Sequence, residues 1–413
     1  MAVDEIARVL FQSVEKTMGV NEPNLLKPFL VFIAILFLTC RVYGQDLVVH
    51  NSKGLRSALK TVKPGTTITL MPGQYRGGIS LSGISGQKNA PITLSGRNKH
   101  KPPVFVGGNE ALHLSNCSHI VIRNIRVRGY PVNGINIDDG GTYSTPSKHI
   151  VLENVTIQNT GPTGNHDALK MSGVDHFVIR NCTFRGWGGS AIDMVGCHHG
   201  VVEDCQFFGA KGFSQSTGIQ MKGGTTHILV RQSFFKNAGY RAINLGGRTG
   251  LKYFRPRVDG YEAKNITVAG NRFVGSEAPL AWVTADGGHV HHNTFMFPGK
   301  WVLRILQETS NPDFKPCGNG VFENNLIVFD KRVRVFVNVG PGTDPQSFLF
   351  SRNAWHQTDG SRKPALPVAE QNGIYLANMK LKHPETKQMM ITSQDPRLVD
   401  IGADAYEAQK DTQ

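Results

Sequence analysis

A four-residue pattern of small, apolar, polar and apolar positions recurs five times in the middle of the chain. Alternate side chains of a strand point to opposite faces, so each copy predicts a short strand with its apolar pair inward. The copies are Gly134–Ile137, Ala168–Met171, Ala191–Met194, Gly218–Met221 and Ala242–Leu245. Stacked on one another, they would place their polar residues in one solvent-facing line formed by Asn136, Lys170, Asp193, Gln220 and Asn244.

A second strand pattern alternates with the first and sets the period of the chain. It begins as Val121-Ile122-Arg123-Asn124, and its inward residues Ile122, Leu152, Ile179, Val202 and Val230 are 30, 27, 23 and 28 residues apart. Strands with a period in the twenties and no helical spacing indicate a β-solenoid. Because parallel crossovers are right-handed, we expect an all-β fold, a single-stranded right-handed parallel β-helix.

Both ends of the repeat differ from its middle. Residues 52–65 space Leu55, Ala58 and Leu59 as in a helix, which predicts an N-terminal capping helix. The uncharged run Pro28–Cys40 is shorter than the about 20 residues of a membrane span, so residues 1–44 are interpreted as a signal peptide or an uncleaved anchor. The β-helix domain then covers residues 45–357, and residues 358–413 form a non-repetitive tail.

The charge balance predicts an anionic partner. Lysine and arginine number 45 against 31 aspartates and glutamates, a net charge of +14. Residues 1–44 contain four basic and four acidic side chains, so the rest of the chain carries the whole excess. A basic, aromatic loop at Lys252–Lys264 interrupts the repeat. Acidic polysaccharide, nucleic acid and anionic surfaces all fit such a charge.

The N-terminal motifs carry a family resemblance. The segments Leu55–Leu59, Lys63–Leu70, Pro72–Tyr75 and Ala90–Leu94 follow one another. Their order resembles the opening of the pectate-lyase-like right-handed β-helix superfamily. It is most similar to the polysaccharide lyase family that holds chondroitinase B and alginate lyases.

The resemblance implies a lysine base, a later arginine and a calcium ion. Lys222, in Met221-Lys222-Gly223, takes the lysine position, and Arg248 takes the arginine position with a shift of a few residues. The family's calcium carboxylates have no match, because Ser216 and Thr217 stand in that region. Calcium is therefore a possible cofactor whose expected ligands are not matched.

The residues themselves suggest the same chemistry. A lyase removes a proton next to a uronate carboxylate, and cationic neighbours would lower the pKa of a lysine base. We predict catalytic roles for Lys222, Arg248 and Lys170. We predict substrate binding by Asn136, Asp193, Gln220, Asn244, Arg241, Trp282 and Arg304, with Trp282 pointing outward to stack on a sugar ring. The histidines, including His198-His199, do not form a convincing metal set.

These features favour a secreted or periplasmic polysaccharide lyase, or a related epimerase, that acts on an acidic polysaccharide. One alternative is a non-catalytic surface solenoid that binds glycans. Another is an inverting glycoside hydrolase, which would need two separated carboxylates such as Asp138 or Asp139 with Asp193. We expect a monomer that does not bind nucleic acid and that meets a membrane only if residues 1–44 remain uncleaved.

Overall fold

The computed structural model of the protein describes residues 44–392 and 395–410. The signal peptide or anchor predicted over residues 1–44 falls outside this part of the chain, apart from Gly44. Within the described part, no helix combines the length and apolar character needed to cross a membrane. The chain winds through three parallel sheets, here called A, B and C, and from Ile79 to Gln357 it visits C, then A, then B in each turn.

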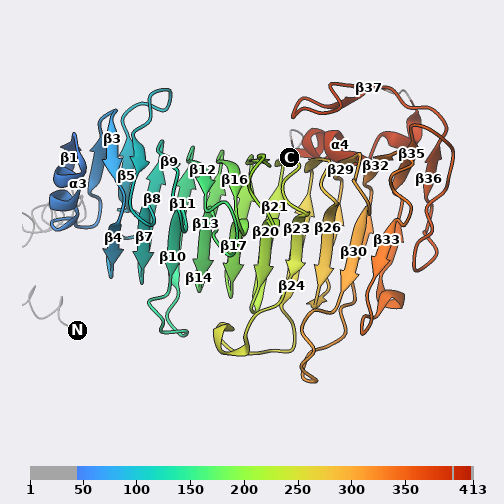
Figure 1. The fold of residues 1–413 in the computed structure, drawn as a ribbon, viewed down its shortest axis with the longest axis horizontal. Helices are drawn as coiled ribbons and strands as arrows, with labels where there is room; N and C mark the ends of the chain where they lie inside the picture. The colour runs from blue at the N-terminus through green and yellow to red at the C-terminus, as the bar shows by residue number, and fades with distance from the viewer. Residues whose placement is uncertain (1–43, 393–394, 411–413) are drawn as a thin grey trace, which may run out of the picture. The chain divides into compact units, whose positions relative to one another are not determined.

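The predicted right-handed parallel β-helix is confirmed, with its strands stacked side by side (Figure 1). Sheet A contains β1 (Asp46–Val49), β2 (Thr67–Leu70), β5 (Ile92–Gly96), β8 (Ser118–Arg123), β11 (Ser147–Glu153), β14 (Val174–Asp175), β15 (Val178–Arg180), β18 (His198–Glu203), β21 (Thr225–Arg231), β24 (Ala263–Ala269), β27 (Ala285–Asp286), β28 (His289–His291), β31 (Val321–Glu323) and β34 (Leu349–Ser351).

The other two sheets complete each turn. Sheet B contains β3 (Gln74–Arg76), β6 (Val104–Val106), β9 (Arg126–Arg128), β12 (Thr156–Thr160), β16 (Thr183–Trp187), β19 (Gln206–Phe208), β22 (Phe234–Lys236), β25 (Arg272–Val274), β29 (Thr294–Met296), β32 (Leu326–Phe329), β35 (Ala354–Gln357) and β36 (Ile374–Leu376). Sheet C contains β4 (Ile79–Ser82), β7 (Leu112–Ser115), β10 (Ile135–Asp138), β13 (Leu169–Ser172), β17 (Ser190–Val195), β20 (Thr217–Lys222), β23 (Arg241–Gly246), β26 (Ala278–Val283), β30 (Leu303–Leu306) and β33 (Val337–Val339).

Like residues stack on like residues along the core, because each rung pairs in register with the next. On sheet B the rings of Phe184, Phe207, Phe235, Phe273 and Phe295 lie parallel, with successive centroids 4.9, 4.5, 4.8 and 4.8 Å apart. Cys182 and Cys205 are buried free thiols in neighbouring rungs. Both stacks place apolar surface where the sequence repeat predicts the core, and burial of that surface stabilises the fold.

A buried ladder of asparagines holds the corner between sheets A and B in the C-terminal half. It consists of Asn271, Asn293, Asn325 and Asn353, all 0% exposed. The side-chain oxygens of Asn293, Asn325 and Asn353 each accept the backbone N–H and the amide of the preceding rung's asparagine, and the oxygen of Asn271 accepts Ser233 N. Each amide also donates to a backbone carbonyl. The ladder ends on Glu370, whose carboxylate accepts from the Asn353 amide at 2.8 Å. Every polar atom of the ladder thus has a partner inside the core.

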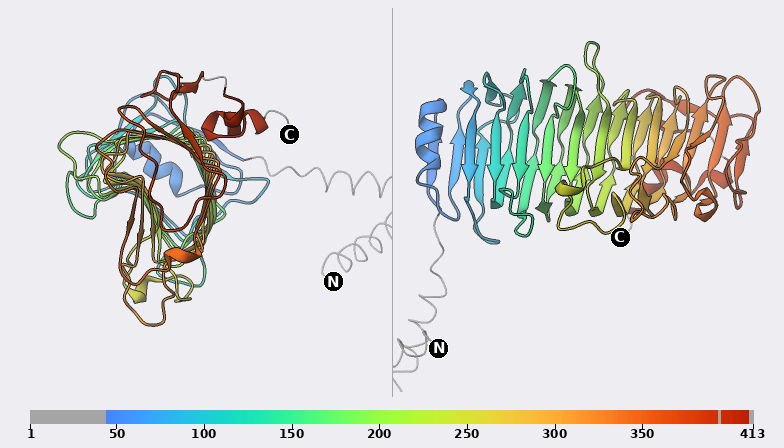
Figure 2. Two further views of the ribbon diagram at one scale, coloured as in Figure 1. Left: turned by 90° about the vertical axis from the view of Figure 1, so that its right-hand side faces the viewer. Right: turned by 60° about the horizontal axis from the view of Figure 1, so that its bottom comes forward.

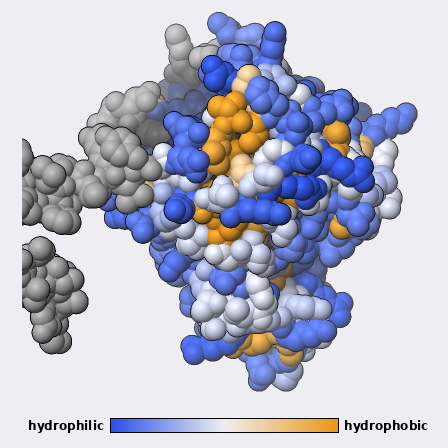
Figure 3. Space-filling view, turned by 90° about the vertical axis from the view of Figure 1, so that its left-hand side faces the viewer, coloured by the Kyte–Doolittle hydropathy of each residue, from blue (hydrophilic) through white to orange (hydrophobic). Residues whose placement is uncertain are grey.

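A helix covers the first rung. Helix α3 (Ser52–Leu59) begins at Asn51, whose side chain accepts from Gly54 N at 2.9 Å, and it buries Leu55, Ala58 and Leu59. Figure 2 shows α3 lying across the end of the coil, so the predicted capping helix is confirmed. The same end, seen in Figure 3, carries an apolar strip among hydrophilic groups, and Val48 on β1 is 53% exposed.

The C-terminal segment folds back on sheet B. After β36, which still pairs with β35, come β37 (Leu381–Lys382), β38 (Met390–Ile391) and α4 (Gly402–Lys410). Helix α4 lies beside β29 and β32 (Figure 1), where Thr294 Oγ1 accepts from Ala403 N at 3.0 Å. Arg272 pairs with Asp404 at 2.7 Å and Glu407 at 2.8 Å. The parallel pairing therefore continues past residue 357, and the segment after it covers an apolar outer face of sheet B.

Removing one rung of the asparagine ladder should destabilise the protein sharply. We expect Asn325→Ala to lower the free energy of unfolding by about 3 kcal/mol or more, because it leaves the Asn293 amide and backbone N–H without their acceptor. Urea unfolding followed by circular dichroism measures the change. The control Asn154→Gly changes an exposed left-handed corner asparagine (φ 52°) and should cost less than about 1 kcal/mol. Equal losses in the two variants would contradict the role given to the ladder.

Candidate functional site

The polar line predicted from the sequence exists as one column on the outer face of sheet C. The pairing places Asn136, Lys170, Asp193, Gln220 and Asn244 opposite one another on consecutive strands, β10 to β23. The column continues through Ala281 and Arg304 to Asn338. The prediction that the whole line faces solvent is wrong, because Asp193 is 1% exposed and Asn244 is 0% exposed. Neighbouring side chains cover these two short polar groups.

Asp193 is the centre of a buried charge cluster. Lys222 Nζ lies 3.0 Å from Asp193 Oδ1, and Lys170 Nζ lies 3.2 Å from Oδ2. Lys170 also pairs with Asp167 Oδ2 at 3.0 Å, and Ser190 N donates to Asp167 Oδ1 at 2.7 Å. Two lysines from different strands therefore share one carboxylate. The cluster joins β13, β17 and β20 and fixes where both ammonium groups lie.

The contacts of the cluster favour the charged forms of Asp193 and Lys170. Burial opposes ionisation of Asp193, but the charges of Lys222 and Lys170 outweigh it and keep the pKa of Asp193 below its ordinary value. Burial alone would lower the pKa of Lys170, yet Asp193 and Asp167 raise it. Burial, reinforced by the charge on Asp193, raises the pKa of Asp167. Lys170 is thus a fixed cation, contrary to the expectation that its neighbours would make it a base.

A cavity of about 760 Å³ opens above this cluster. Its lining includes the predicted residues Asn136, Lys170, Asp193, Lys222 and Arg248. Two loops that extend from the same edge of the strands, after β10 and after β23, form its wall (Figure 1). Arg255 joins them, because its Nε donates to Asp139 Oδ2 at 2.7 Å and its guanidinium lies 4.2 Å from the Tyr143 ring centroid. Arg248 is exposed at the cavity, and no ion pair joins it to another described residue.

Glu262 positions the segments that carry Lys222 and Arg248. This carboxylate is 0% exposed and accepts from Gly223 N, Thr249 N and Thr249 Oγ1, each at 2.7 Å. It also accepts from Thr309 Oγ1 at 2.8 Å. The residues directly after Lys222 and Arg248 are therefore bound to one buried group. Gly247 brings the chain close as well, because a Cβ there would lie 2.5 Å from Gln220 Nε2.

Several residues in the cavity or directly beside it were not predicted as site residues. His113 Nε2 lies 2.6 Å from Asp138 Oδ2, and Ser115 Oγ donates to Asp138 Oδ1 at 2.7 Å. Burial would raise the pKa of Asp138, but these contacts outweigh it and lower the pKa. Tyr143 and Tyr253 also line the cavity. The basic and aromatic composition of Lys252–Lys264 was a signal for Tyr253, whereas His113 and Tyr143 stand in segments without such a signal.

The remaining predicted residues lie outside this cavity. Arg241 and Arg304 line a separate hollow, and Gln220 and Asn244 lie between the two. The prediction that Trp282 points outward is wrong. Trp282 pairs with Leu245 and Ile305 on the inward side, is 0% exposed and donates from Nε1 to Gly287 O at 3.1 Å. The outward position of β26 belongs to Ala281, so Trp282 cannot contact a glycan.

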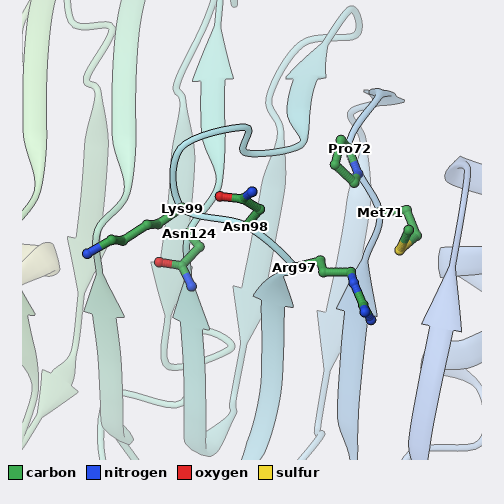
Figure 4. Close-up of a pocket in the computed structure, with 6 residues that line it drawn as sticks. All are labelled: Met71, Pro72, Arg97, Asn98, Lys99 and Asn124. Carbon is green, nitrogen blue, oxygen red and sulfur yellow. The ribbon is translucent and has the colours of Figure 1, made fainter.

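A third hollow lies near the N-terminal end and does not resemble a site. It has a volume of about 520 Å³ and is lined by Met71, Pro72, Arg97, Asn98, Lys99 and Asn124 (Figure 4). The side chains of Arg97 and Lys99 point away from each other (Figure 4). Its two cations therefore do not converge on one ligand.

The cavity's carboxylates do not fit a calcium ion. Asp193 is bound by two lysines, Asp139 by Arg255 and Asp138 by His113. Among residues 44–392 and 395–410, no group of three histidine, cysteine or acidic side chains is arranged to hold a metal. Instead, the histidine rings at 119, 149, 176, 199 and 227 stack with centroids 4.4 to 5.2 Å apart. In the cavity, lysine and arginine side chains supply the positive charge.

Comparisons with known proteins establish the fold. Residues 110–295 match the family model described as a right handed beta helix region. An alginate lyase from Paenibacillus sp. str. FPU-7 is 17% identical, with 72% of this chain and 96% of that one covered and a TM-score of 0.43. Pectate lyase Pel9A is 13% identical over 75% and 80%, with a TM-score of 0.50. An exopolygalacturonase from Thermotoga maritima is 12% identical over 76% and 87%, with a TM-score of 0.52.

The comparison with curated proteins finds no match. The structural neighbours include a pectate lyase and an exopolygalacturonase, so the shared β-helix does not determine the reaction. The reaction is therefore inferred from the side chains that line the cavity.

Removing the central carboxylate should destabilise the protein in a pH-dependent way. We expect Asp193→Asn to lower the free energy of unfolding by about 3 kcal/mol at neutral pH, because two largely buried ammonium groups lose their shared counter-charge. The pKa of Asp193 is lowered by folding, so its contribution is present above its unfolded value of about 3.9 and lost as pH falls below it.

Urea unfolding at several pH values measures this difference between wild type and variant. The control Asp259→Asn removes an exposed pair with Arg257 and should cost less than about 1 kcal/mol. A loss for Asp193→Asn that persists unchanged at acid pH would contradict the assignment.

Proposed function

We propose that the protein is an exported lyase, or a related epimerase, that acts on an acidic polysaccharide bound in the cavity above Asp193. The observation that supports this most is the cationic wall formed by Lys170, Lys222 and Arg248 around a cavity of about 760 Å³. Three cations line this cavity, and Asp193, the carboxylate that two of them share, is buried. A uronate carboxylate fits this distribution of charge. The working unit we propose is a monomer.

The proposed roles follow from the contacts. Arg248 is exposed at the cavity and binds the uronate carboxylate. Lys170 is held as a cation by Asp193 and Asp167, and it stabilises the negative charge that develops when the neighbouring proton leaves. Charge stabilisation by side chains placed in advance needs no metal ligand. This matches a cavity in which every carboxylate already has a protein partner.

Lys222 is the proposed base. Its ammonium lies 3.0 Å from Asp193, so it has to release one proton to solvent before its amine can accept the substrate proton. Lys170 competes for the same carboxylate, which leaves each lysine one oxygen of Asp193. In a lyase, the electron pair left on the deprotonated sugar carbon forms a double bond to the adjacent carbon, and the glycosidic oxygen on that adjacent carbon leaves and takes up a proton from water. An epimerase would return a proton to the opposite face.

The glycoside hydrolase alternative is less well supported. An inverting hydrolase needs two carboxyl groups about 6.5–9.5 Å apart, one of them protonated. The cavity is lined by Asp138, Asp139 and Asp193, and contacts lower the pKa of Asp138 and Asp193. Asp139 is 1% exposed and bound by Arg255. Each of these three carboxyl groups is already bound to a histidine, lysine or arginine side chain, so they do not form a free carboxyl pair.

Incubation with alginate, polygalacturonate and chondroitin tests the proposal. We expect the ultraviolet absorbance of an unsaturated product from one of them, and a loss of about 100-fold or more in rate for Lys222→Met. The control Lys60→Ala, at an exposed lysine after α3, should keep wild-type activity.

Each other outcome has a distinct meaning. New reducing ends without the absorbance would favour a hydrolase. Binding without any product, and without carbon epimerisation detected by nuclear magnetic resonance, would favour the non-catalytic glycan-binding solenoid. Full activity in Lys222→Met would refute the base, and Lys170→Met would then test the second lysine.

A further inference from the structure

A second hollow lies on the same sheet, at the edge where the strands of sheet C begin. It has a volume of about 220 Å³ and is separate from the cavity above Asp193. Its walls come from β23, β26 and β30 and from the corners before them. It is lined by Ser216, Tyr240, Arg241, Glu277, Ala278, Trp301 and Arg304.

Arg304 is the main polar group of this hollow. Its guanidinium lies 4.5 Å from the Trp301 ring centroid, and its Nε donates to Asn338 Oδ1 at 2.8 Å. Within residues 44–392 and 395–410, it forms no ion pair of its own. The indole and the amide therefore fix the guanidinium, while its terminal N–H groups have no carboxylate partner.

A like charge stands beside Arg304. Arg241 Nη1 lies 2.9 Å from Glu308 Oε1, and Lys300 Nζ lies 3.6 Å from Glu277 Oε1. The three cations face two carboxylates, so one positive charge remains unbalanced. Burial and the charge of Arg241 lower the pKa of Arg304 and outweigh the opposing charges of Glu308 and Glu277. An entering anion would relieve this repulsion.

The hollow is aligned with the cavity. Arg304 and Asp193 occupy the same column, four strand spacings apart through Gln220, Asn244 and Ala281. At about 4.8 Å per spacing, this separation is about 19 Å. Tyr240, 60% exposed at the rim, offers a ring on which a sugar can lie. A linear polymer running across the strands would therefore meet both places.

We propose that this hollow is a second subsite, in which Arg304 binds the carboxylate of a uronate unit several sugars away from the one in the cavity. The subsite rests on the proposed function, since it takes the same glycan chain. Trp301 and Asn338 position the arginine, and Tyr240 contacts the sugar ring. Long oligomers engage both places at once, whereas short ones reach only one, so the subsite sets a length preference.

Trp301 makes the binding observable. The other tryptophans, Trp187, Trp282 and Trp355, are 0%, 0% and 2% exposed, whereas Trp301 is partly exposed in the hollow. A ligand at Arg304 should change the fluorescence of Trp301 and protect it from iodide quenching.

The experiment titrates a disaccharide and a hexasaccharide of the uronate polymer, in a Lys222→Met background that keeps the ligand intact. We expect Arg304→Gln to weaken hexasaccharide binding about tenfold or more and to leave the disaccharide's affinity unchanged. Tyr240→Ala changes an exposed residue, so it should not affect folding, and it should weaken hexasaccharide binding about threefold or more. The control Arg126→Gln, at an exposed arginine on sheet B, should change neither affinity.

The results separate this proposal from the proposed function. If uronate oligomers are bound or cleaved but Arg304→Gln and Tyr240→Ala leave the hexasaccharide's affinity unchanged, the subsite is wrong and the cavity stands. Equal weakening of both oligomers would also overturn it, because Arg304 would then act on the cavity. A sulfated galactan carries sulfate groups but no carboxylates. If it binds at Arg304 in place of the uronate, the carboxylate assignment is overturned. No binding of any uronate would overturn both proposals.

Discussion

In-register pairing of parallel rungs is the constraint on which the core and the cavity both depend. The spacing of about 4.8 Å between strands puts each residue directly against its counterpart in the next turn. Apolar side chains stack favourably at that spacing, as the phenylalanine series on sheet B does. Polar side chains tolerate it only when neighbours complement each other. The Asn271 to Asn353 ladder meets this demand with hydrogen bonds. Asp193 meets it with charge, because Lys170 is its in-register neighbour and Lys222, two residues beyond the other neighbour Gln220, reaches its second oxygen.

The alternation of charge explains why Asp193 is buried without being isolated. A carboxylate between two lysines on adjacent strands receives one ammonium on each oxygen. The three side chains then carry a net positive charge toward the cavity, because the negative member lies beneath the other two. The same arrangement places cationic groups at the surface of the cavity and keeps the acidic group beneath it, which suits the anionic polymer proposed above.

The sequence predicts the repeat period and the inward-facing residues, because both depend on the alternation of apolar and polar residues within each strand. The column from Asn136 to Asn244 was predicted for the same reason, and its strands pair as the pattern requires. The sequence misplaces Trp282 because β26 contains only small and apolar residues. The outward position of this strand is Ala281, so no polar residue shows which side faces outward. The partners Glu262, His113 and Arg255 were missed because they reach the site from other turns. Asp139 and Arg255, for example, are joined across loops that no local pattern relates.

The contacts of Glu262 indicate when the site forms during folding of the chain. Its carboxylate binds backbone or hydroxyl groups of Gly223, Thr249 and Thr309, which belong to segments up to 47 residues from it along the chain. Closing such contacts costs chain entropy that only previously stacked rungs can offset. The loops that carry Lys222 and Arg248 therefore acquire their final form after the turns on both sides of them have formed. A partly wound chain would then have a growing core but no finished cavity.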